Sequence, residues 1–126
     1  MVNEVKGFRT LAAWRKAYDL TLVIYRLSRT FPREETYALS SQLQRAAVSV
    51  PANIAEGYER KSKKEYLQFL HISQGSLGEI ETYLLLARDL GYIDEQSYCG
   101  ANDLREETAR ILRGLIRAIE KAARTT

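Results

Sequence analysis

Apolar residues recur at helical spacing in four segments, at about residues 11–28, 38–56, 62–90 and 94–123. Residues three or four positions apart lie on one side of an α-helix, whereas a half-buried strand alternates apolar and polar residues. No segment alternates convincingly, so the pattern predicts an all-α fold. Because the connections between the segments are short, we expect one domain, residues 1–126, folded as an antiparallel up-down-up-down four-helix bundle.

The first predicted helix is apolar on two sides. One stripe, which includes Ala17, Leu20 and Ile24, suits the core of a bundle. A second stripe lies beside it and consists of Leu11, Trp14, Tyr18, Leu22 and Tyr25. A helix that packs only on its own core needs an apolar arc of roughly 100°. We therefore predict that the second stripe is an oligomer interface.

The second predicted helix contains a proline. Pro51 has no amide proton and crowds the carbonyl of Ala47, but the apolar register continues past it. The pattern therefore predicts a kink at Pro51 rather than a break. Gly57 is expected to cap the C-terminus of this helix. Ser62 and Glu65 then form a capping box that starts the third helix.

The third segment predicts the longest helix, about 43 Å at 1.5 Å per residue, ending at Gly91. Gly75 and Gly78 lie within it, where missing side chains are expected to let helices approach closely rather than to cradle a phosphate. Asp94 follows as the cap of the fourth helix.

Several segments together match the pattern of a known family. They are residues 8–17, Phe31-Pro32 with Glu35, residues 42–57 followed by Arg60, Ser62 and residues 64–66, Gly75-Ser76-Leu77 with Glu79 and Glu81, and residues 90–92. Over about residues 8–120 the chain resembles the four-helix bundle proteins encoded within intervening sequences of 23S ribosomal RNA genes. The resemblance implies a homopentamer with no established enzymatic activity and no assigned biological role.

A more distant similarity is to the accessory protein of diversity-generating retroelements. That protein is also a basic pentameric bundle, and it works with a reverse transcriptase and nucleic acid. Its role is not carried over to this chain, because the whole family shares the bundle and much of its pattern. Ser49, Pro51, Asn53 and Glu56 fall on the signature positions of the family, for which no chemistry is agreed.

A candidate polar group lies beside the proline. Asn53 and Glu56 are three residues apart on a largely apolar helix. A buried Glu56 would need a partner, for which Arg45 and the first amides of the third helix are candidates. We interpret Arg45, Asn53 and Glu56 as a structural network that satisfies backbone groups freed by Pro51. A catalytic role is the alternative.

Charge is distributed unevenly along the predicted bundle. The chain has 19 Lys and Arg against 16 Asp and Glu, a net charge of +3. In the expected topology one pole carries 11 basic and 6 acidic residues. The opposite pole carries 5 basic and 8 acidic residues, and the middle carries 3 basic and 2 acidic residues. Candidate nucleic-acid-binding residues are Arg60, Lys61, Lys63, Lys64, Arg110, Arg113, Arg117, Lys121 and Arg124. The alternative is a solvated face whose last cations complement the helix dipole.

Cofactor chemistry finds little support in the sequence. A di-iron bundle site needs Glu-x-x-His pairs, but the single histidine, His71, follows Gln68 at that spacing. Cys99, the single cysteine, has no second thiol with which to bind zinc or form an internal disulfide. We predict no metal site, no cofactor and no catalytic residue. The start lacks an apolar leader and no apolar run nears the roughly 20 residues of a membrane span, so we expect a cytoplasmic protein.

These observations predict a non-enzymatic, self-assembling four-helix bundle. Its expected function is to bind RNA or a nucleic-acid-processing partner through the basic pole, with contacts that do not depend on base sequence. The alternative is a protein-only scaffold that binds no nucleic acid.

Overall fold

The computed structural model describes the backbone of residues 6–125 and the side chains of residues 6–122. Within these residues no strand is present, and the predicted all-α four-helix fold is confirmed. The elements are the 3-10 helices η1 (Gly7–Thr10) and η2 (Arg33–Glu35) and the α-helices α1 (Ala12–Ser28), α2 (Leu39–Tyr58), α3 (Lys63–Asp89) and α4 (Glu95–Thr125).

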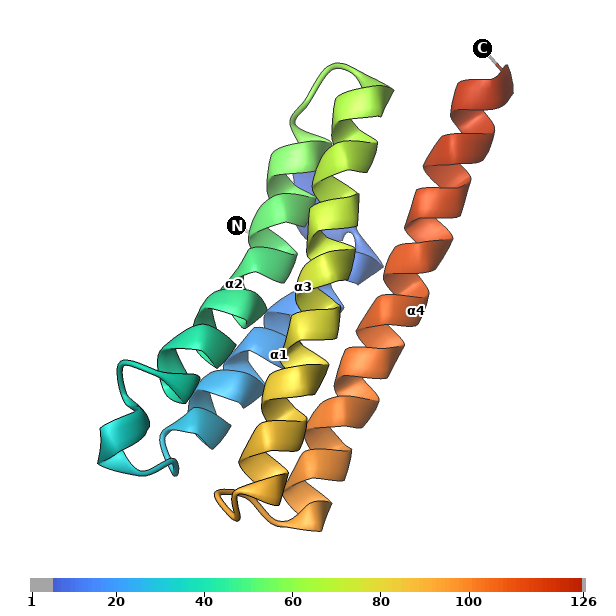
Figure 1. Ribbon diagram of the computed structural model, residues 1–126. Helices are drawn as coiled ribbons and strands as arrows, with labels where there is room; N and C mark the ends of the chain where they lie inside the picture. Colours follow the sequence, from blue (N-terminus) through green and yellow to red (C-terminus); the bar gives the residue numbers. More distant parts are fainter. Residues whose placement is uncertain (1–5, 126) are drawn as a thin grey trace, which may run out of the picture.

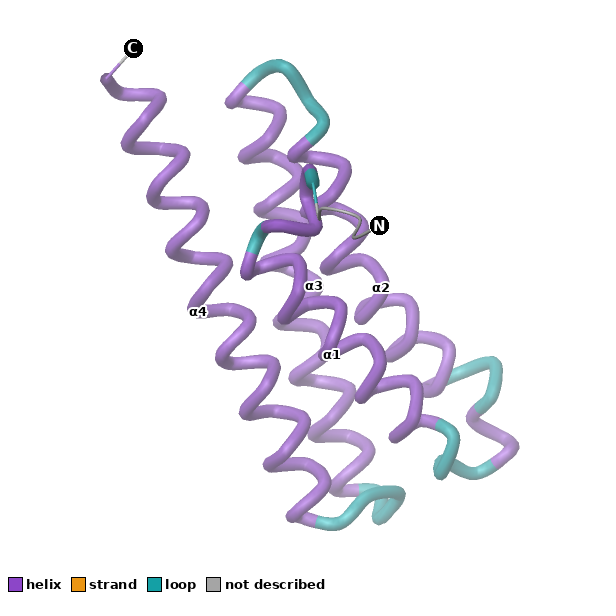
Figure 2. The backbone as a smooth tube through the Cα atoms, turned by 180° about the vertical axis from the view of Figure 1, so that it is seen from behind, coloured by secondary structure: helices purple, strands orange, loops and turns teal. Residues whose placement is uncertain are grey.

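Successive α-helices run in opposite directions (Figure 1). Each packs against its neighbours in the chain, and α4 also packs against α1, whereas the diagonal pairs α1–α3 and α2–α4 make no close backbone contact in the described residues. The α1–α2 and α3–α4 links therefore lie at one end of the bundle, and the α2–α3 link lies at the other end together with the C-terminus of α4 (Figure 1). Figure 2 shows from behind that α4 diverges from the other helices toward its C-terminus.

The expectation that the third helix is the longest is wrong. Helix α3 has 27 residues, whereas α4 has 31. Gly91, which adopts a φ of 79°, lies just beyond α3 and turns the chain out of the helix. Nothing comparable stops α4, which contains no proline and whose φ angles at Gly100 and Gly114 are negative.

Asp94 caps α4 as predicted. Of the two hydrogen bonds of the predicted capping box at α3, only the one to Ser62 Oγ is formed in the described residues, because the Glu65 carboxylate faces Arg60. Ser62 Oγ accepts a hydrogen bond from the Glu65 amide at 3.2 Å, and Asp94 Oδ1 accepts one from the Ser97 amide at 2.7 Å. The backbone amide of Ser97 lowers the pKa of Asp94 because it stabilises the carboxylate. This contribution to stability is present above the ordinary pKa of an aspartate and is lost as the pH falls through the lowered value.

Gly57 has a different role from the predicted one. It lies inside α2 without a positive φ, so it is not a left-handed cap. A Cβ atom added there would lie 2.9 Å from Phe69 Cβ and 3.1 Å from the Tyr66 carbonyl oxygen, so Gly57 lets α2 and α3 approach closely. The expectation that Gly75 and Gly78 let helices approach closely is wrong within the chain, because a Cβ atom at either position meets nothing within 4 Å.

The core is formed by one apolar stripe from each helix. Its large, fully buried members are Leu20, Ile24, Leu43, Val50, Ile54, Leu70, Leu77, Ile80, Leu84 and Leu112. Burying one such side chain stabilises the fold by about 1.5–3 kcal/mol. The stripe that contains Leu20 and Ile24 is the one that the sequence assigned to the core of the bundle.

Helix α2 is continuous across Pro51. Proline has no amide proton, so the Ala47 carbonyl lacks its usual partner four residues later. The hydroxyl of Thr21 on α1 lies 3.0 Å from that carbonyl oxygen and 2.8 Å from the carbonyl oxygen of Ala17, so it can donate to either. A neighbouring helix thus places a donor within hydrogen-bond distance of the backbone group that Pro51 frees. The kink at Pro51 stays a prediction.

Candidate functional site

Exposed cations lie at the α2–α3 link and along α4. We call Lys61, Lys63, Lys64, Arg110, Arg113, Arg117 and Lys121 the basic surface. All of them are exposed, and none lies within ion-pair distance of a carboxylate in the described part of the chain. The predicted Arg124 lies in α4, but its side chain is outside the described residues.

The two parts of the basic surface approach the same end of the bundle. Lys61 lies in the α2–α3 link and Lys63 and Lys64 begin α3, and the stripe on α4 runs toward the C-terminus beside that end (Figure 1). On α4 the cations lie away from the stripe that contains Leu112 and Ile116, whose side chains are buried. A strand of phosphates could therefore contact this surface without disturbing the core.

Arg60 differs from its lysine neighbours. Its guanidinium pairs with Glu56, lies 3.6 Å from Glu65 Oε2 and stacks 4.8 Å above the ring of Phe69. These contacts join the end of α2 to the start of α3. Because its charge is compensated within the chain, we leave Arg60 out of the basic surface.

The predicted polar network of Arg45, Asn53 and Glu56 is not formed. Arg45 is exposed and makes no ion pair among the described residues. Glu56 pairs with Arg60, and Asn53 Nδ2 donates to the carbonyl and hydroxyl oxygens of Ser49 at 2.8 and 2.9 Å. The expectation was wrong because Glu56 is exposed and needs no buried partner.

A buried hydroxyl seam between α2 and α3 was missed by sequence reasoning. Ser76 Oγ donates to Ser49 Oγ at 2.8 Å, and Ser73 Oγ donates to the Val50 carbonyl at 2.8 Å. Ser73 and Ser76 occupy the register of the buried stripe on α3. That register was the available signal, since a small hydroxyl at a core position needs a hydrogen-bond partner.

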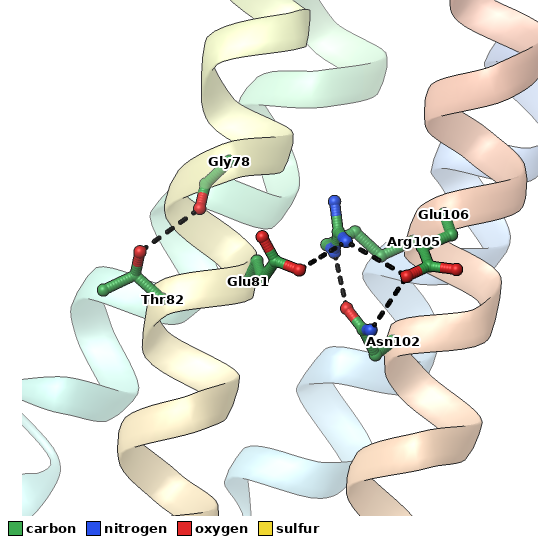
Figure 3. Close-up of polar contacts among 6 residues, drawn as sticks. All are labelled: Gly78, Glu81, Thr82, Asn102, Arg105 and Glu106. Carbon is green, nitrogen blue, oxygen red and sulfur yellow. Dashed lines mark hydrogen bonds and ion pairs between the residues drawn. The ribbon is translucent and has the colours of Figure 1, made fainter.

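A buried arginine joins α3 to α4 and was also missed (Figure 3). Arg105 is 8% exposed. Its Nε donates to Asn102 Oδ1 at 2.7 Å, and its Nη2 lies 2.9 Å from Glu81 Oε2 and 3.9 Å from Glu106 Oε1. Sequence reasoning counted Arg105 only as a charge at one pole. The sequence signal for burial was that Arg105 follows Ala101 by four residues and so lies in the buried stripe of α4.

The second stripe of α1 lies on the surface of the chain. Tyr18, Leu22 and Tyr25 are 47%, 39% and 37% exposed, and Leu11 and Trp14 are partly buried. The rings of Trp14 and Tyr18 stack with centroids 5.1 Å apart. We call these five residues the α1 apolar face.

His71 and Cys99 are both on the surface. His71 is exposed, and its Nδ1 lies 3.3 Å from Gln74 Oε1. Desolvation, followed by the negative charge of Glu95, raises the pKa of the exposed Cys99 thiol and so disfavours the reactive thiolate. Within the described residues no three His, Cys, Asp or Glu side chains are placed to hold a metal ion. In the same part of the chain, no helix combines the length and apolarity needed to cross a membrane.

Comparison with known proteins identifies the family. The family described as 23S rRNA-intervening sequence protein matches residues 9–114. The chain belongs to this family. A crystal structure of a protein of unknown function from the S23 ribosomal protein family, from Bacteroides thetaiotaomicron, has the same fold as this family member, with a TM-score of 0.78. It is 24% identical and the match covers 83% of this chain and 98% of the other. No curated protein matches this family member significantly.

Proposed function

We propose that the protein is a cytoplasmic, non-enzymatic assembly that binds RNA through its basic surface. The observation that carries the proposal is the set of exposed cations on α4 and the α2–α3 link that no carboxylate compensates in the described residues. The exposed His71 and the disfavoured Cys99 thiolate support a non-enzymatic role.

The contacts would be to phosphates rather than to bases. Each cation that neutralises a phosphate releases condensed counterions, and this release makes the affinity depend on salt. For a single strand, the logarithm of the affinity falls by about 0.7 per contact for each tenfold rise in salt. Arg113 and Arg117 lie on one side of α4 and are exposed, so one backbone could contact both. Several subunits that present this surface together would add their contacts.

A charge-matched pair of variants tests the proposal. We expect Arg113→Glu/Arg117→Glu to weaken binding of a short single-stranded RNA by about 100-fold at about 50 mM salt, because two phosphate contacts are lost. Arg26→Glu/Arg45→Glu changes the net charge equally but alters exposed arginines elsewhere, so we expect less than about a threefold loss. Fluorescence anisotropy across a salt series measures both. Equal losses in the two variants, or no binding by the unmodified protein at low salt, would overturn the proposal in favour of a protein-only scaffold.

We further propose that the α1 apolar face joins the subunits, in the homopentamer that the family resemblance implies. Tyr18, Leu22 and Tyr25 form a contiguous stripe that the bundle itself leaves exposed. Exposed contiguous apolar surface on a folded chain is typical of a protein interface.

A single charge on this face should dissociate the assembly. We expect Leu22→Glu to reduce the mass measured by light scattering to that of the 14.4 kDa chain, because a buried, unpaired carboxylate opposes association. Leu86→Glu, at another exposed leucine on α3, should leave the mass unchanged. Dissociation by Leu86→Glu alone, or a monomeric unmodified protein, would contradict the assignment of the interface.

A further inference from the structure

A small cavity lies where α1 ends and α2 begins. Its volume is about 330 Å³, and its lining includes Ser28, Arg29, Arg33, Ser40 and Gln44. The α1–α2 connection, which supplies part of the lining, lies at the end of the bundle opposite the α2–α3 link (Figure 1). Any ligand here would therefore be independent of the basic surface at Lys61, Lys63 and Lys64.

Ser40 lines this cavity with an unused hydroxyl. The residue is only 7% exposed, and its Oγ makes no hydrogen bond within the described part of the chain. Every fully enclosed side-chain nitrogen or oxygen in that part has a partner. The Ser40 hydroxyl therefore opens into the space that the residue lines, where it can donate to a ligand.

The same place is the N-terminus of the 20-residue helix α2. Ala38 at the cap position supplies no side-chain acceptor, and the amides of Ser40 and Ser41 donate to no acceptor among the described residues. Amides at a helix start point outward and, with the helix dipole, favour an anion.

The carboxylate of Glu35 caps the first amide of α2 but does not line the cavity. Its Oε1 accepts a hydrogen bond from the Leu39 amide at 3.3 Å, and its Oε2 accepts one from the Tyr92 hydroxyl at 2.7 Å. The carboxylate therefore bridges the first amide of α2 and Tyr92 in the α3–α4 link, and Glu35 is not among the residues that line the cavity. The charge at the cavity comes instead from Arg29 and Arg33, which are exposed and form no ion pair in the described chain.

We propose that this cavity binds a phosphate group. The hydroxyl and amide of Ser40 supply neutral donors, and the guanidinium groups of Arg29 and Arg33 supply charged donors. Planar guanidinium groups together with helix-start amides are the donors that recur in phosphate sites. Gln44 Nε2 donates to Ser28 Oγ at 2.8 Å and fixes one wall of the cavity.

Titration with inorganic phosphate at constant ionic strength tests the site. We expect saturable shifts of the Ser40 and Ser41 amide signals in TROSY spectra. Arg33→Gln should weaken binding about tenfold, because it removes a charged donor. Ser40→Ala should weaken it about fivefold, because it removes one neutral donor. Arg45→Gln, an exposed arginine on the same helix outside the cavity, should leave the affinity unchanged.

Four outcomes decide the proposal. Absence of saturable shifts at Ser40 and Ser41 with both inorganic phosphate and a short RNA would overturn it, as would unchanged affinity in Arg33→Gln. Saturation by inorganic phosphate supports a site for free phosphate. Shifts only with a short RNA at equal phosphate concentration support a site for a backbone phosphate. The variant Arg113→Glu/Arg117→Glu leaves this cavity intact, so the phosphate titration of the variant should match that of the unmodified protein. This result is expected whether or not the variant loses RNA binding, so the two proposals can fail independently.

Discussion

Glu81→Gln is expected to lower the free energy of unfolding by about 3 kcal/mol, because it leaves the charge of Arg105 without its nearest counterion. The Arg105 side chain is only 10% exposed, and its Nη2 lies 2.9 Å from Glu81 Oε2 (Figure 3). Since the Glu81 side chain is itself 44% exposed, the effect should fall at the low end of the range for buried pairs. Urea denaturation followed by circular dichroism measures it.

Two further variants separate charge compensation from packing. Glu106→Gln removes a carboxylate 3.9 Å from the same Nη2 and should cost less than about 1 kcal/mol, since that side chain is exposed. The double variant Arg105→Met/Glu81→Leu replaces both charges by apolar groups and should cost less than Glu81→Gln alone. If Glu81→Gln is as stable as the unmodified protein, the pair does not hold α3 to α4.

Thr21→Val should lower the free energy of unfolding by about 2 kcal/mol, because the Ala47 carbonyl then has neither its helical partner nor the hydroxyl of α1. The substitution removes the hydroxyl while nearly preserving side-chain volume. In a Pro51→Ala background the amide at position 51 can donate to Ala47 again. There the same substitution should cost about 0.5 kcal/mol or less. Thermal unfolding of the four proteins in this cycle provides the comparison.

Thr108, on another helix, supplies the control for this cycle. Thr108 Oγ1 donates to the Leu104 carbonyl within α4 at 2.7 Å, far from Pro51 in the chain. Thr108→Val should therefore cost the same with or without Pro51. An equal cost of Thr21→Val in both backgrounds would show that the Thr21 hydroxyl serves Ala17 rather than Ala47.

Much of the fold could be predicted from the sequence because its signals are local. Helical spacing identified the four helices, Ser62 and Asp94 identified two helix starts, and Gly91 identified a helix end. The role of Gly57 could not be read in this way. Its position suggested a cap, but the chain uses its missing side chain for contact with Phe69, which lies on another helix.

In the candidate sites, too, local features could be predicted and contacts between helices could not. An exposed cation such as Lys61 is visible from its residue type, but the different state of Arg60 depends on how Glu65 and Phe69 meet it across a turn. Thr21 lies 26 residues from Ala47 and Glu81 lies 24 residues from Arg105. Such pairings depend on how helices are rotated against one another, which spacing along one helix does not specify.

The stacking of Trp14 on Tyr18 gives the α1 apolar face an optical reporter. Trp14 is the single tryptophan of the chain, and its indole lies within the surface that we assign to subunit contact. Indole emission depends on how much water surrounds the ring, so burial of this face by a second subunit changes the fluorescence of the unlabelled protein. Assembly can thus be followed by dilution without attaching a dye to Cys99, the single cysteine of the chain.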